Sequence, residues 1–160
     1  MNPVRYILLF ICLQANLTAF AGNVPSAVRD SLKVLFPSVR TVGWNTDGNY
    51  YVAGFQSEGF VVRVWFDTQG HWVMRQTDWG NLDEAPMPVY HTFTYGPYST
   101  DNVLDVTLAE FPHQTSQVVV RIGIDNALTE YQLFYYPDGT LINARNVTYM
   151  NNILGANTFL

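Results

Sequence analysis

The chain contains two segments in which apolar and polar residues alternate on either side of a tight turn. These segments are "GFVVRVWFDTQGHWVMR", Gly59 to Arg75, and "LTEYQLFYYPDGTLINA", Leu128 to Ala144. Such alternation indicates β-strands with one buried face, and a glycine in the turn supplies the backbone conformation that a hairpin needs. Each segment therefore predicts a β-hairpin, and their likeness suggests that a longer unit is written twice.

An apolar stripe of helical spacing precedes the first hairpin. Val28, Leu32 and Leu35 follow one another at intervals of four and three residues, which is typical of one helix face. Pro37 ends this predicted helix, because proline lacks the backbone N–H that would continue it. A second, weaker helix is predicted near 87–95, where threonine, tyrosine and glycine lower the helix propensity.

Four strands are expected after each helix. Their ranges are 39–46, 49–57, 60–67 and 71–77 in the first copy, and 102–110, 116–124, 128–136 and 140–146 in the second. Pro25 matches Pro86 and Gly70 matches Gly139, and the offset between the copies grows only in candidate turns, where insertions are tolerated. We therefore predict an α+β fold of two tandem repeats, each a helix packed on a four-stranded antiparallel sheet, joined into one pseudo-symmetric domain.

The repeat defines the expected organisation of the chain. Repeat one spans 24–78, a linker spans 79–85, repeat two spans 86–146 and a C-terminal tail spans 147–160. One unit of about 55 residues buries too little of its unfolded surface to be more than marginally stable. We therefore expect a single cooperative domain over 22–160.

The first residues have the order of a secretory signal. Arg5 precedes an apolar run over 6–13, and the triplet A-F-A ends at Ala21. The run is shorter than the about 20 residues that a membrane-spanning helix needs. We expect cleavage after Ala21, removal of 1–21 and a periplasmic or secreted mature chain without a transmembrane segment. A buried N-terminal helix is the alternative.

Cys12 is the only cysteine of the chain, and it lies inside the predicted signal. The mature chain is therefore expected to have no disulfide, thiol nucleophile or thiolate metal site. Attachment of a lipid to Cys12 fits less well than ordinary cleavage, because bulky Ile11 stands where lipoprotein processing requires a small residue.

The charge balance restricts the possible partners. The chain has eight basic and thirteen acidic residues, a net charge of −5, and loss of Arg5 with the signal makes it −6. Nucleic-acid binding depends on basic residues that neutralise phosphates, and no basic cluster is present in the sequence. The same balance argues against electrostatic docking on anionic lipid.

Sequence motifs of common enzyme classes do not occur. There is no G-x-S-x-G elbow, P-loop or H-E-x-x-H sequence. His71, His91 and His113 are isolated, while Asp67 and Asp138 flank hairpin turns, where short acidic side chains hydrogen-bond the backbone. We therefore expect no catalytic residue, no bound metal and no cofactor, and interpret the chain as a non-enzyme.

One face of the predicted sheet carries an unusual set of side chains. Alternation separates the residues that pack under the helices from those that point the opposite way. The opposite, solvent-facing set is rich in aromatic and arginine side chains, which protein interfaces concentrate. The candidate binding residues are Tyr50, Arg63, Trp65, Arg121, Gln132 and Phe134. Alternatively, the rings pack against each other or under the C-terminal tail.

Together these features resemble a known family. The secretory signal, "VPSAV", "YYVAGF", "VRVWFDTQGHW" and "FYYPDGTLI" look like the PepSY-like secreted proteins described as beta-lactamase-inhibitor-like. The resemblance covers about 25–146 and implies tandem units of a helix against a four-stranded sheet. It provides no catalytic residues. The streptomycete inhibitor that gave the family its description grips its enzyme with a concave, aromatic sheet face. This chain lacks the disulfides of that inhibitor, so the partner is not carried over.

Three functional hypotheses follow. The first is an exported non-enzymatic protein that recognises a protein partner, such as an exported enzyme that it inhibits, with the aromatic sheet surface. The second is a binder of a small molecule or a cell-envelope polymer at the seam between the repeats, near Trp44 and Trp79. Trp79 motivates it because a large ring in a polar linker often marks a ligand platform or a seam. An enzyme is the third.

Overall fold

The computed structural model describes residues 24–126, 128–150 and 154–160. The predicted signal, 1–21, lies outside these described residues. Within them, no helix is both long enough and apolar enough to cross a membrane.

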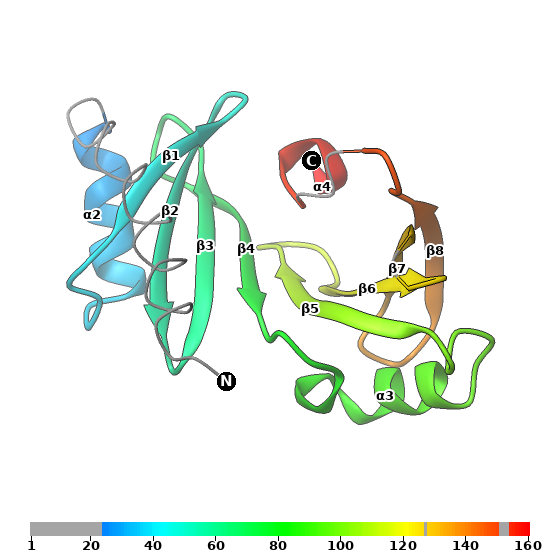
Figure 1. The fold of residues 1–160 in the computed structure, drawn as a ribbon. Helices are drawn as coiled ribbons and strands as arrows, with labels where there is room; N and C mark the ends of the chain where they lie inside the picture. The colour runs from blue at the N-terminus through cyan, green and yellow to red at the C-terminus, as the bar shows by residue number, and fades with distance from the viewer. Residues whose placement is uncertain (1–23, 127, 151–153) are drawn as a thin grey trace, which may run out of the picture.

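Eight strands form one antiparallel sheet whose spatial order is the order of the strands along the chain (Figure 1). They are β1 (Gly43–Asp47), β2 (Tyr50–Ser57), β3 (Phe60–Phe66), β4 (Trp72–Asp78), β5 (Asn102–Glu110), β6 (Gln117–Ile124), β7 (Thr129–Tyr135) and β8 (Leu141–Asn146). Hairpins connect the strands within each set of four, as the alternating pattern and the glycine turns predict.

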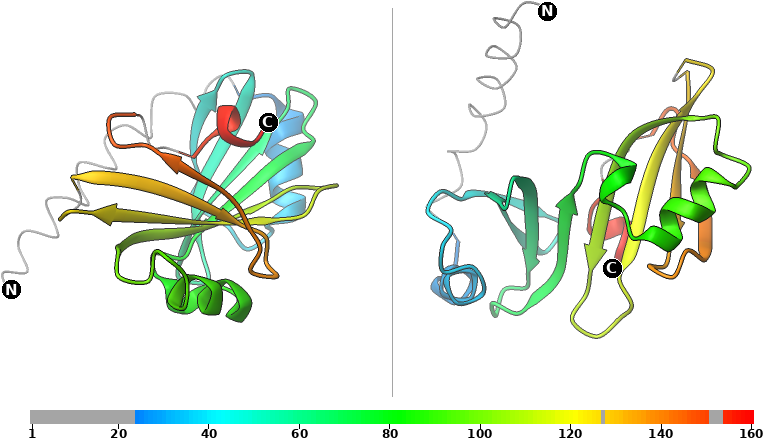
Figure 2. Two further views of the ribbon diagram at one scale, coloured as in Figure 1. Left: turned by 90° about the vertical axis from the view of Figure 1, so that its right-hand side faces the viewer. Right: turned by 90° about the horizontal axis from the view of Figure 1, so that it is seen from below.

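The helices lie on both faces of the sheet. They are α2 (Ser26–Leu35) ahead of β1, the short 3₁₀ helix η1 (Leu82–Glu84) and α3 (Met87–Thr94) ahead of β5, and α4 (Ala156–Phe159) at the C-terminus. Figures 1 and 2 show α2 and α3 on the outside of the curved sheet, and α4 on the other side, between the two halves.

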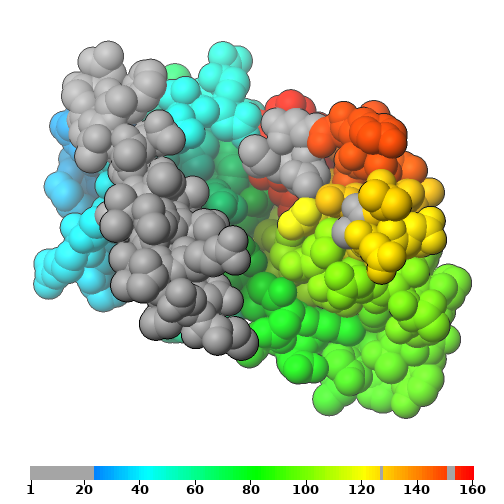
Figure 3. Space-filling model, viewed as in Figure 1, coloured from blue at the N-terminus to red at the C-terminus, as the bar shows by residue number. Residues whose placement is uncertain are grey.

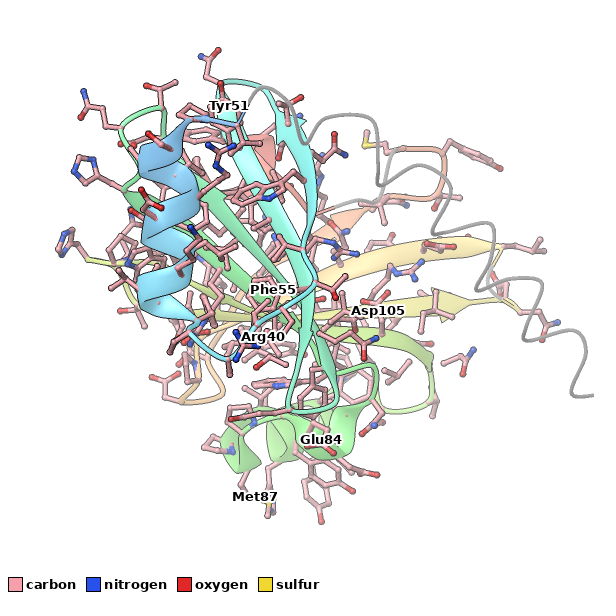
Figure 4. The ribbon with its side chains drawn as sticks, turned by 90° about the vertical axis from the view of Figure 1, so that its left-hand side faces the viewer. Arg40, Tyr51, Phe55, Glu84, Met87 and Asp105 are labelled. Atoms are coloured by element: carbon pink, nitrogen blue, oxygen red, sulfur yellow. The ribbon has the colours of Figure 1, made fainter. Side chains whose placement is uncertain are left out.

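Each of the two outer helices closes its own apolar core. Val28 and Leu32 of α2 are buried against the helix-facing residues of β2 and β3, and Phe55 of β2 is part of this cluster. Tyr51 and Phe55 both lie on β2, and Figure 4 shows them at well-separated points along the sheet beside α2. Val89 of α3 is likewise buried against β5, β6 and β7. Packing of this apolar face explains why α3 forms although its intrinsic propensity is low.

A glycine in one hairpin of each half is fixed by contact with a helix. Gly70 and Gly139 have φ values of +91° and +89°, which residues with a side chain rarely adopt. A Cβ atom on Gly70 would lie 2.7 Å from the carbonyl oxygen of Ala27 in α2. A Cβ atom on Gly139 would lie 2.6 Å from the carbonyl oxygen of Pro88 in α3. Both turns therefore pack directly on helix backbone.

The sheet continues without interruption from β4 to β5. Arg75 pairs with Glu110 in the register, and Asp78 pairs with Thr107. The Arg75 guanidinium donates two hydrogen bonds of 2.6 Å to the Glu110 carboxylate. The two sets of four strands are therefore parts of one sheet.

One strand begins later in the structure than the sequence pattern predicts. The sequence pattern predicts the first strand over 39–46, whereas β1 begins at Gly43. The Val39 amide donates a hydrogen bond to the Phe36 carbonyl oxygen, which makes a turn after α2. Val39 and Val42 still pack against the first core, so their apolar pattern reflects burial without strand pairing.

Candidate functional site

The candidate site is the face of the sheet opposite α2 and α3, which we call the inner face. Cross-strand partners share a face of a sheet. Val52 pairs with Trp65 and Trp65 with Met74, while Arg121 pairs with Gln132 across the second half. The strand register therefore places all the predicted binding residues on the inner face, namely Tyr50, Arg63, Trp65, Arg121, Gln132 and Phe134.

Half of this predicted set is buried. The exposed fraction is 3% for Trp65, 6% for Phe134 and 2% for Gln132. The expectation that these three residues form a solvent-facing surface is therefore wrong. For the two rings the reason is the C-terminal segment, because Trp65 clusters with Ala156 and Phe134 contacts Phe159. Trp65 and Phe134 therefore pack under the C-terminal tail, as the alternative interpretation of the sequence predicts.

The C-terminal segment is held to the inner face by hydrogen bonds as well as by apolar contact. One carboxylate oxygen of Asp47, at the end of β1, accepts a 2.8 Å bond from Trp65 Nε1 and a 2.7 Å bond from the Ala156 amide. Gln76 Nε2, on β4, donates to the carbonyl oxygen of Leu154 at 3.2 Å. Gln76 is itself almost fully buried, so this bond satisfies a polar group that water does not reach.

The ring of Phe159 occupies an aromatic slot on the inner face. Its centroid lies 5.6 Å from that of Phe111 and 6.0 Å from that of Phe134, in tilted and edge-on arrangements that favour aromatic pairs. The slot therefore combines a ring that follows β5 with a ring of β7. In Figure 3, atoms of α4 (red) are visible between the two halves of the molecule.

Charged side chains form a second region of the inner face, on β5, β6 and β7. Arg121 donates to Asp105 at 2.6 Å and to Glu130 at 3.1 Å, and each of the three side chains is about a quarter exposed. Burial is the main cause that raises the pKa of Asp105; the hydrogen bond and charge of Arg121 lower it, and the nearby carboxylates of Asp78 and Glu130 add smaller upward contributions. Burial alone lowers the pKa of Arg121, but its bonds to Asp105 and Glu130 raise it above the ordinary value. The pKa of Arg121 is therefore raised by its two carboxylate partners, whereas the pKa of Asp105 is raised mainly by burial.

The remaining predicted residues are accessible. Arg63 is exposed in the middle of β3, opposite Gly54 and Gln76. Tyr50 is half-buried at the start of β2 and packs against the cluster around Trp65. The open part of the inner face therefore contains a tyrosine and an arginine beside the covered part.

The structure separates the two tryptophans on which the seam hypothesis depends. Trp44 packs in the first core, with its ring 6.4 Å from that of Phe66. Trp79 packs against the second core, and its amide donates to the Val106 carbonyl oxygen. The two rings therefore do not support the predicted seam site near Trp44 and Trp79, because each packs against a different core. A hollow of about 280 Å³ lies elsewhere at the seam, lined by Leu35, Phe36, Val64, Trp72, Arg75 and Glu110.

The residues considered for chemistry have ordinary partners. His71 lies 3.0 Å from Asp67 in its hairpin turn, and His91 stacks near Tyr95. Among the described residues, no three histidine, cysteine or acidic side chains gather in an arrangement that could hold a metal ion.

Sequence reasoning misses the two elements that organise the inner face. From the sequence, Asp47 is only part of a turn before Gly48, and packing of the tail over the rings is only one of two alternatives. The signal that the tail offers is its apolar residues, which include Phe159 and Leu160. A segment this short has no periodicity from which a packing partner can be predicted.

Comparison with known proteins places the chain in a family. Neither a family model nor a curated protein matches it. A DUF2874 family protein from Bacteroides uniformis of known structure is 47% identical, with a TM-score of 0.82, and the match covers 85% of this chain and 99% of that one. The chain belongs to the DUF2874 family.

Two further solved structures are similar to this chain. A protein from Bacteroides eggerthii, described as a candidate periplasmic protein, is 39% identical with a TM-score of 0.82, covering 87% of this chain and 100% of that one. A BLIP-like protein from Bacteroides fragilis is 28% identical with a TM-score of 0.77, covering 84% and 95%. These matches support a BLIP-like fold, while membership of the PepSY-like group stays a prediction.

Proposed function

We propose that the chain is an exported, non-enzymatic protein that recognises a protein partner with the inner face of its sheet. The observation that carries this proposal is that the inner face already holds a polypeptide segment. It binds α4 through the Asp47 carboxylate, the Gln76 amide and an aromatic slot. Aromatic rings with a few directed polar groups are the usual content of a protein-binding surface.

Two comparisons support export and protein binding. The protein from Bacteroides eggerthii is described as a candidate periplasmic protein, which agrees with the signal pattern over 1–21. The Bacteroides fragilis neighbour is named BLIP-like, an inhibitor-type name that supports a partner-binding rather than a catalytic role. A partner-binding role of this kind includes inhibition of an exported enzyme.

The tandem organisation is part of the same proposal. We infer that each half, an outer helix with four strands, is one copy of a repeated unit. The equivalent packing of Gly70 on α2 and of Gly139 on α3 supports this inference. Two copies side by side give an inner face long enough to enclose a polypeptide segment.

The open part of the inner face provides the test. Arg63→Glu changes an exposed residue, and Tyr50→Ala changes a half-buried residue that packs against the cluster around Trp65. Neither residue belongs to the cores under α2 and α3. Arg29→Glu is the matched control, because Arg29 is exposed on α2, on the opposite side of the sheet. The unaltered protein, cross-linked in an envelope extract of the producing bacterium, identifies the partner, and titration with the purified partner then measures affinity.

We expect each inner-face variant to weaken partner binding about tenfold or more, which corresponds to about 1.4 kcal/mol. The Arg29→Glu control is expected to bind as the unaltered chain does. Equal binding by all three variants would contradict the inner face as the recognition surface.

The seam hollow favours a second candidate function, the binding of a small molecule or an envelope fragment. Its lining combines apolar side chains with the Arg75–Glu110 ion pair, but its volume of about 280 Å³ is below the about 300–1,000 Å³ of typical ligand sites. A thermal-shift screen with cell-wall fragments, comparing the unaltered chain with Trp72→Ala, tests it. Stabilisation of only the unaltered chain would favour this function.

A further inference from the structure

The segment that covers the inner face is held as a peptide ligand is held. Its backbone contributes the Ala156 N–H to Asp47 and the Leu154 carbonyl oxygen to Gln76, while its ring enters the slot between Phe111 and Phe134. These contacts use main-chain groups, which every polypeptide has, and one side-chain anchor.

We propose that the inner face is a receptor for a short peptide segment of another polypeptide, and that α4 is the intramolecular occupant which that segment replaces. This inference rests on the proposed function and names the chemistry of the partner. The partner contributes an uncharged segment with a small residue followed, three positions later, by an aromatic residue.

The contacts of α4 specify these requirements. Ala156 is buried in a cluster with Val52, Trp65 and Met74, where a larger or charged side chain would lose its solvation without gaining a partner. The Asp47 carboxylate requires a backbone N–H at the position of Ala156, which excludes proline there.

The position before the small residue is also restricted. A Cβ atom on Gly155 would lie 2.7 Å from the Asp47 carboxylate oxygen. That oxygen is fixed by its bonds to Trp65 and Ala156, so it has little freedom to move away. The segment that fits the inner face is therefore Gly-Ala-x-x-aromatic, or a close variant.

The size of α4 makes its replacement energetically feasible. A helix of four residues has no independent stability in water. Phe159 is only partly buried, and Leu160 is half exposed. Because α4 is tethered to the sheet, its effective concentration at the slot is high. The apparent affinity of a competing segment is therefore its intrinsic affinity multiplied by the fraction of time that the slot is open.

The test uses the full chain and a peptide with the sequence of residues 154–160, LGANTFL, labelled for fluorescence anisotropy. The variant Phe159→Ala removes the anchor of α4 and keeps the whole receptor surface. We expect the peptide to bind this variant with one-to-one stoichiometry and to bind the unaltered chain at least about tenfold more weakly. A control peptide with alanine in place of its phenylalanine is expected to bind neither.

A second measurement avoids any variant. In the unaltered chain, excess peptide should increase the hydrogen-exchange rate of the Ala156 amide, because the peptide takes over its bond to Asp47. The control peptide should leave that rate unchanged.

Absence of peptide binding to a folded Phe159→Ala chain, with unchanged exchange at Ala156, would overturn the inference. A concentration-dependent dimer of this variant without peptide binding would also overturn it, by assigning the slot to a second copy. Neither result affects the proposed function if Arg63→Glu still weakens partner binding. Conversely, peptide binding together with unaffected partner binding by Arg63→Glu would overturn the proposed function alone.

Discussion

Asp47 is the single residue on which the inner face depends most. Its carboxylate satisfies the buried indole N–H of Trp65 and fixes the start of α4 through the Ala156 amide. The two groups come from different halves of the chain, so one side chain connects β1, β3 and the C-terminal segment.

Replacement of Asp47 by alanine is therefore expected to destabilise the protein. Loss of the acceptor leaves a buried indole N–H without a partner, which lowers the free energy of unfolding by about 1–3 kcal/mol. Asp30→Ala is the control, because the Asp30–Lys33 pair on α2 is exposed and contributes little. Urea denaturation of both variants measures the difference, and equal stabilities would show that the Asp47 bonds are unimportant.

Two turn aspartates predict how stability depends on pH. Burial by itself raises the pKa of Asp67, but hydrogen bonds from His71 and Gln69 lower it below 3.8. The backbone N–H of Thr140 lowers the pKa of Asp138 in the same way. A lowered folded-state pKa adds stability that is fully present above the unfolded pKa and is lost as the pH falls through the folded pKa.

The double variant Asp67→Asn/Asp138→Asn removes this pH-dependent stability. We expect the unaltered chain to be more stable than the double variant at neutral pH. The difference should shrink as the pH falls below 3.8, the ordinary value. Chemical denaturation of both proteins between neutral pH and about pH 3 measures it. A difference that stays constant over this range would contradict the assigned role of the two carboxylates.

At the scale of elements, each outer helix depends on a hairpin of its own half. The turn at Gly70 packs on Ala27 of α2, and the turn at Gly139 packs on Pro88 of α3. Each of these contacts lies within one half and involves no residue of the other half.

Alanine substitutions separate this packing from backbone strain. Gly59 has nearly the same φ, +89°, as Gly70, but a Cβ atom on Gly59 would have nothing within 4 Å, so Gly59→Ala measures strain alone. Gly70→Ala adds a collision with helix backbone, and we expect it to cost about 1–3 kcal/mol more in the free energy of unfolding. Equal losses in thermal or urea unfolding would show that the turn does not depend on its contact with α2.

At the scale of the whole molecule, the inner cluster joins the two halves. It contains Val52, Trp65 and Met74 from the first half, Ala109 and Phe111 from the second, and Ala156 from the C-terminal segment. This cluster and the β4–β5 pairing join the two halves. If the halves were separated, each would expose a strand edge and its inner face.

We therefore predict one cooperative unfolding unit. Residues 22–80 and 84–160, expressed separately, are expected to lack sharp melting transitions in circular dichroism, whereas the intact chain melts once. Two halves that each melt sharply, and together reproduce the intact chain, would show that the repeat is modular.

Local pattern by itself determined the elements of this protein. Alternation along β3 and β7, the stripe of Val28 and Leu32, and the glycine turns predicted the strands and the helices α2 and α3 to within a few residues, because these signals depend only on near neighbours. The same alternation placed all six candidate residues on one face. The start of β1 was the exception, since burial of Val42 without strand pairing has the same local pattern.

Tertiary structure alone decided which part of that face is covered. The bond from the Ala156 amide to Asp47 joins residues 109 positions apart, and nothing near either residue specifies the other. Coverage of Trp65 and Phe134 follows from that long-range contact. A terminal segment of a few residues has no periodic pattern, and its position is set by the shape and polarity of a surface that exists only after the sheet has formed.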